Sequence, residues 1–206
     1  GVVVAFGFAI LMNGISYFFS DKIVLAIYRA QPVDEKTIEG KRIHSLVRNV
    51  SMQMKIPLPK LFIVNEKSPN AFATGRDPEH AAIAFTQGIL PLLNDEELTG
   101  VIAHELSHVK NRDVLVATMA ATIAGAIGML AHMMQWAAFG SRDRDSKNII
   151  GLIVIAISVP IIAMLIQLAV SRSREFLADE TAAHTLHTGK GLASALGKLE
   201  KGIHHV

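Results

Sequence analysis

Three long apolar runs, at 1–20, 114–140 and 149–171, constrain this chain more than any other feature of its sequence. Each run is long enough for a helix to cross the roughly 30 Å hydrocarbon core of a bilayer. Half of all residues are hydrophobic and only 18% are charged, a balance that is typical of a membrane protein. We therefore expect a mainly α membrane protein, in which transmembrane helices alternate with polar segments.

The polar segments define the remaining parts of the chain. We expect 21–113 and 172–206 to be the first and second parts of one soluble domain, and 141–148 to be a short loop between two spans. Because the runs at 114–140 and 149–171 leave the soluble phase and return to it, both parts of the soluble domain lie on the same side of the membrane.

The first soluble part combines a helical pattern with short extended segments. Residues 34–54 have apolar side chains at helical spacing and predict an amphipathic helix. Residues 61–66, 70–74 and 81–86 are extended in pattern and are separated by turn signals that contain proline. These three segments predict a small antiparallel meander.

The segment 98–113, LTGVIAHELSHVKNRD, carries the residues with the most distinctive chemistry. On a helix His104 and His108 lie on one face and can share a metal ion, with Glu105 beside them. A zinc ion held there would polarise a water molecule, and Glu105 would accept its proton. Asn94 and Glu97 predict the start of this helix as a capping box. Its apolar face consists of Leu98, Val101, Ile102, Leu106 and Val109.

A catalytic zinc site needs a third protein ligand and an open position for water. The chain has no cysteine, so the ligand has to be a histidine or a carboxylate. Glu175 is the best candidate, although a surface carboxylate paired with an arginine is the alternative for it. Asp179, one helical turn later, can accept the second ring N–H of a ligand histidine. Candidates for stabilising the oxyanion are Arg172, Arg174, His184 and His187.

Two segments, AHELSHVKNRD and SRSREFLADETAA, resemble the signature segments of HtpX-type membrane zinc endopeptidases, and PNAFATG resembles their edge-strand motif. The resemblance implies a gluzincin-like α+β catalytic domain with a small β-sheet. It implies that Glu105 is the general base, and that Asn70 and Ala71 belong to the strand that holds the substrate backbone. The implied ligands of one zinc ion per chain are His104, His108 and Glu175.

The resemblance also implies a location and partners. HtpX-type proteases are multi-pass proteins of the cell inner (plasma) membrane, with the catalytic part facing the cytoplasm. They degrade misfolded or damaged membrane proteins in stress quality control. The family has four predicted spans, so we expect a missing one to precede Gly1. The expected partners are protein or peptide substrates and the lipid bilayer. A net charge of +2 is too small to indicate nucleic acid.

Two other functions are compatible with parts of this pattern. A CAAX prenyl-protein endopeptidase-like enzyme has a similar zinc signature in a membrane, but it has more spans around its site. A non-catalytic zinc-stabilised membrane adaptor would use the metal only to join the two soluble parts. Glu105 argues against the adaptor, because a structural zinc site has no need of a base.

Overall fold

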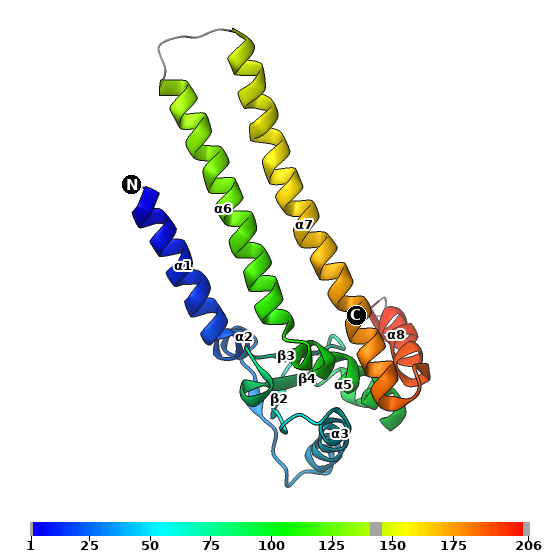
Figure 1. The fold of residues 1–206 in the computed structure, drawn as a ribbon. Coiled ribbons are helices and arrows are strands. Elements are labelled where there is room, and N and C mark those ends of the chain that lie inside the picture. The colour runs from blue at the N-terminus through cyan, green and yellow to red at the C-terminus, as the bar shows by residue number, and fades with distance from the viewer. Residues whose placement is uncertain (1, 141–145, 204–206) are drawn as a thin grey trace. The chain divides into compact units, whose positions relative to one another are not determined.

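The structure is a computed structural model that describes residues 2–140 and 146–203 (Figure 1). The chain forms two compact units, each made from two separate stretches of sequence. The helical unit contains Gly1–Gly14 and Val116–Ser173. The sheet unit contains Ile15–Leu115 and Arg174–Val206.

The helical unit is formed by parts of three helices, α1 (Val2–Phe18), α6 (Asp113–Gly140) and α7 (Ser146–Leu186). Within the described residues, the segment Ile157–Leu186 is long and apolar enough to cross a membrane. The number of such spans rises to three if each of two bent helix pairs counts as one. The expected spans at 1–20, 114–140 and 149–171 stay predictions.

The sheet unit contains the remaining elements and the C-terminal part of α7. The amphipathic helix expected at 34–54 is confirmed as α3, which begins after Thr37 because the Thr37 side chain accepts a hydrogen bond from Gly40 N–H. The elements are α2 (Ser20–Ile27), β1 (Gln31–Pro32), α3 (Ile38–Met54), β2 (Lys60–Val64), β3 (Ala71–Thr74), η1 (Pro78–His80), β4 (Ala82–Thr86), α4 (Ile89–Leu92), α5 (Asp95–Lys110) and α8 (Lys190–Ile203).

The four strands form a mixed sheet in the order β1-β2-β4-β3. β4 pairs in parallel with β2 and antiparallel with β3, so the predicted antiparallel meander is wrong. The reason lies in β4, whose five residues are all buried. A strand buried along its whole length is suited to the interior of a sheet. β4 therefore lies between β2 and β3, and β3 is an edge strand.

The core of the sheet unit lies between one face of the sheet and the helices α3 and α5. Ile83 and Phe85, two residues apart on β4, point into this core and are fully buried. α3 contributes Ile43, Val47, Val50 and Met54. The apolar face predicted for α5 is confirmed, because all five of its residues are buried: Leu98, Val101, Ile102, Leu106 and Val109. This packing fixes α5 against the sheet and leaves its histidine-bearing side toward α7.

Candidate active site

The helix α5 begins where the capping pattern predicts. The Asn94 side chain accepts a hydrogen bond from Glu97 N–H, and the Glu97 carboxylate accepts one from Asn94 N–H, each at 2.9 Å. The same carboxylate accepts hydrogen bonds from Ser194 and Lys198 of α8, each at 2.7 Å. The start of α5 is therefore joined to α8, which holds the helix in place.

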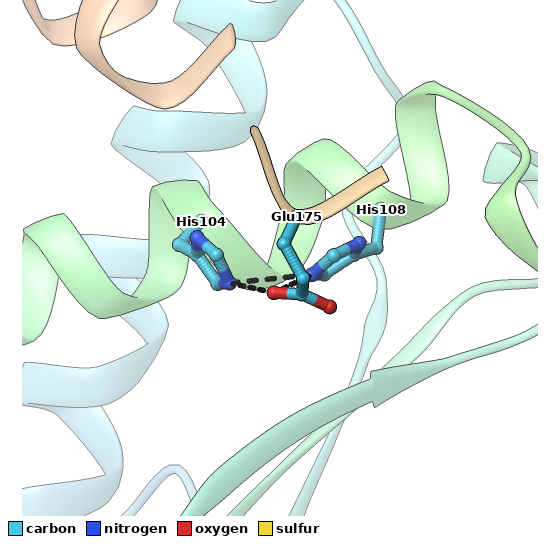
Figure 2. A group of neighbouring side chains, drawn as sticks. All are labelled: His104, His108 and Glu175. Atoms are coloured by element: carbon cyan, nitrogen blue, oxygen red, sulfur yellow. Dashed lines mark hydrogen bonds and ion pairs between the residues drawn. The ribbon is translucent and has the colours of Figure 1, made fainter. Parts of the chain in front are cut away.

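His104 and His108 of α5 meet Glu175 of α7 (Figure 2). The two Nε2 atoms lie 3.2 Å apart. Oε2 of Glu175 lies 3.5 Å from Nε2 of His104 and 3.8 Å from Nε2 of His108. Glu175, more than sixty positions after His108 in the sequence, thus joins the two histidines, and the three potential metal ligands point toward one another.

Each histidine binds a second carboxylate through its other ring nitrogen. Nδ1 of His104 lies 2.8 Å from Asp179, and Nδ1 of His108 lies 2.6 Å from Asp113. Because an ionised carboxylate only accepts hydrogen bonds, each Nδ1 carries the proton and donates it. Both Nε2 atoms are then acceptors, as is the Glu175 carboxylate. With these tautomers the three acceptors converge without a donor among them, an arrangement that suits a metal cation at their centre.

The distances between these acceptors fit zinc. A tetrahedral zinc ion with bonds of about 2.0–2.1 Å holds its ligand atoms about 3.3 Å apart, and the three separations here are 3.2, 3.5 and 3.8 Å. Two histidines and one glutamate also form a known catalytic ligand set with a fourth position for water. Among the residues that the structure describes, no other group of three such side chains is close enough to share an ion.

Glu105 lies beside His104 on α5 and faces the edge of the sheet. Its Oε2 accepts a hydrogen bond from the backbone N–H of Ala73 in β3 at 3.1 Å. Burial raises the pKa of Glu105 to about 7, and the interaction with His104 and the hydrogen bond from Ala73 offset part of this rise. A carboxyl group with a pKa near 7 is suited to accept and return a proton at neutral pH.

The hydrogen bond from Ala73 shows which way the backbone of β3 faces. The backbone groups of an antiparallel strand point alternately toward the partner strand and away from it. The carbonyl of Asn70 accepts a hydrogen bond from Thr86 N–H, so Ala71 and Ala73 direct their backbone groups away from β4. No described strand lies on that side of β3. The structure places Ala71 in this edge strand and the exposed Asn70 immediately before it.

Asp113 is a site residue that sequence analysis missed. One of its carboxylate oxygens binds His108, and the other accepts from Nε of Arg174 at 2.6 Å and from Nη2 of Arg174. Nη2 of Arg174 also donates to the carbonyl of Asn111 at 2.7 Å. Arg174, considered as an oxyanion stabiliser, is instead engaged in holding Asp113. The available signal was the position of Asp113 five residues after His108.

Comparisons with known proteins identify the family of the chain. The model of peptidase family M48 matches residues 37–205. A protease HtpX homologue of Syntrophobacter fumaroxidans is 52% identical over 99% of the chain and 74% of its own length. A protease HtpX homologue of Pyrococcus furiosus is 51% identical over the whole chain and 71% of its own length.

A solved structure has the same fold. The crystal structure of S. mikatae Ste24p superposes with a TM-score of 0.70 at 16% sequence identity. The match covers 97% of the chain, and the chain spans about half (51%) of the length of Ste24p.

Fold, site and relatives together define a metalloprotease. The chain belongs to peptidase family M48, and the relatives described above place it among the HtpX proteases of that family.

Proposed function

We propose that the chain is a zinc endopeptidase in which His104, His108 and Glu175 hold one zinc ion per chain and Glu105 is the general base. The observation that carries this proposal is the convergence of three acceptor atoms beside a carboxyl group with a pKa near 7. A bound zinc ion would supply Lewis acidity toward the scissile carbonyl and toward the attacking water.

The side chains of the site divide the remaining work. Glu105 accepts a proton from the attacking water and passes it to the leaving amine. Asp179 and Asp113 fix the orientation and tautomer of His104 and His108, so that both Nε2 lone pairs face the metal position.

The substrate lies along the outer edge of β3. An extended peptide can pair there with the outward backbone groups of Ala71 and Ala73, close to Glu105. The side chain of Asn70 adds a hydrogen bond to the substrate backbone. Because main-chain pairing does not depend on side chains, we expect broad sequence specificity.

The enzyme acts at a membrane. We propose that 1–20, 114–140 and 149–171 are transmembrane helices, and that 21–113 and 172–206 form the catalytic part on the cytoplasmic side of the inner (plasma) membrane. Its substrates are misfolded or damaged membrane proteins under stress. The apolar helices and the HtpX relatives support this assignment.

The decisive experiment compares the wild type with Glu105→Gln in lipid vesicles. Glutamine keeps an oxygen that accepts the Ala73 N–H but cannot accept the proton of water. We expect equal zinc content in both proteins and no cleavage of an unfolded membrane protein by the variant. Chelation should abolish wild-type cleavage and added zinc should restore it. Wild-type cleavage by the variant would refute the assignment of the base, and preference for a prenylated peptide would favour a CAAX-type enzyme.

A further inference from the structure

The short helix α2 has two unlike halves. At 100° per residue, Lys22, Ile23, Ala26 and Ile27 occupy one half of its circumference, and all four are exposed. Ile27 is 71% exposed and Ile23 is 40% exposed. The opposite half is half-buried throughout and consists of Ser20, Asp21, Val24 and Leu25. The exposed apolar residues Ile23, Ala26 and Ile27 are unfavourable in water, and such a patch is typical of a surface that contacts a partner or a membrane.

α2 lies against β3, and the residues that flank the helix on both sides hold it there. Just after the helix, the ring of Tyr28 packs against that of Phe72 in β3, with ring centroids 4.8 Å apart. Just before it, the guanidinium of Arg76, in the loop after β3, lies 5.5 Å from the ring centre of Phe18. Nη1 of Arg76 also donates to the carbonyl of Phe18 at 3.4 Å. One end of α2 is therefore attached to β3, the strand beside Glu105, and the other end to the loop that follows this strand.

The chain before α2 indicates that lipid covers the exposed apolar residues. α2 follows the apolar helix α1, and the chain bends by 73° between Ile10–Phe18 and Ser20–Ile27. A helix that leaves a membrane span at such an angle runs along the bilayer surface rather than away from it. The ammonium of Lys22 lies 5.4 Å from the ring centre of Phe19. A lysine beside an apolar surface can keep its charge at the headgroups while its alkyl chain covers that surface.

We propose that α2 lies in the interfacial layer of the bilayer, with Ile23 and Ile27 facing the acyl chains. β3, on the other side of α2, is then held about one helix diameter, ~10 Å, from the headgroups. Combined with the proposed function, this position determines which substrates are reached. The enzyme cleaves extended segments close to the membrane surface in preference to segments far out in soluble domains.

The position of α2 can be tested without any measurement of activity. The chain has no cysteine, so Ile27→Cys gives a single site for an environment-sensitive fluorophore. Ile38→Cys on α3, where the side chain is 89% exposed, is the matched control. In phosphatidylethanolamine–phosphatidylglycerol vesicles we expect spin-labelled lipid to quench the label at 27 and aqueous iodide to quench the label at 38.

Two results would overturn the proposal. Equal quenching by iodide at 27 and 38 would place α2 in water. Protection from iodide without quenching by lipid, increasing with the protein-to-lipid ratio, would mean that a second copy covers the helix.

The consequence for substrates has its own test. A membrane-anchored substrate carries one cleavable segment, either directly after its span or after a long flexible linker. We expect faster cleavage next to the span. The double variant Ile23→Asn, Ile27→Asn should remove this preference. Its cleavage of the near-membrane substrate should be about tenfold slower than that of the wild type, which corresponds to losing part of the burial free energy of an isoleucine. Its cleavage of a soluble peptide should stay unchanged. Equal cleavage at both positions by the wild type would refute the consequence. No cleavage of any substrate, with the label in lipid, would refute only the proposed function.

Discussion

Replacing Asp179 by alanine should weaken zinc binding without unfolding the protein. The change removes the acceptor that lies 2.8 Å from Nδ1 of His104, so the ring loses its fixed tautomer and orientation. Loss of such a partner lowers metal affinity by about 10- to 100-fold, which corresponds to roughly 1.4–2.7 kcal/mol. Because the Asp179 side chain is 53% exposed, the melting temperature of the metal-free protein should change little.

The matched variant Asp113→Ala should behave differently. It removes the corresponding partner of His108, so a similar loss of zinc affinity is expected. It also deprives Arg174 of its carboxylate, and the Arg174 side chain is only 19% exposed. Leaving a partly buried charge without its partner should lower the unfolding free energy of the metal-free protein by about 1–3 kcal/mol.

Zinc affinity can be measured by competition with a chromogenic chelator in detergent, and stability by thermal circular dichroism of the metal-free proteins. The reasoning about Asp179 is wrong if Asp179→Ala binds zinc as tightly as the wild type. The contrast between the two carboxylates is wrong if both variants have the same metal-free melting temperature.

Two further predictions concern the contact between α5 and α8. A Cβ atom at Gly100 would lie 2.4 Å from the backbone nitrogen of Leu192, so Gly100→Ala should destabilise the protein by about 1–3 kcal/mol. The control Gly197→Ala meets no neighbouring atom and should stabilise α8 by about 0.5–1 kcal/mol in the same denaturation measurement; equal effects would contradict the close approach. Hydrogen bonds, led by that from Lys198, lower the pKa of Glu97 from 4.5 to about 2. The stabilising effect of the Glu97 carboxylate is therefore complete above pH 4.5 and is lost as the pH falls toward 2. Glu97→Gln should flatten the acid side of a plot of melting temperature against pH. An unchanged slope would disprove this role of Glu97.

Local patterns were sufficient to predict the helix that carries His104 and Glu105, because its cap and its apolar face both lie within α5 itself. The expected ligand Glu175 was found by reasoning about which segments return to the same side of a membrane. The structure brings this residue to within 3.5 Å of His104. Such reasoning can predict that two distant residues lie close together when a short, chemically unusual motif leaves few partners to choose from, and the role of Glu175 as a ligand stays a prediction.

The order of the strands could not be obtained in this way. Whether β4 pairs with β2 or only with β3 depends on packing against α3 and α5. The sequences of the three short strands do not by themselves indicate this packing. Asp113 was missed for a similar reason. Its pairing with Arg174 joins residues 61 positions apart, and in the sequence Asp113 looks like an ordinary charge just before an apolar run.

The hydrogen bond between Ala73 and Glu105 makes one amide serve two tasks. A peptide that pairs with β3 as proposed would require the same N–H that donates to Glu105. Under the proposed function, docking and activation would compete for a single proton donor, and substrate binding would release Glu105 from the strand so that its carboxylate could turn to water. Arrival of the substrate itself would then switch the base from a resting to a working position.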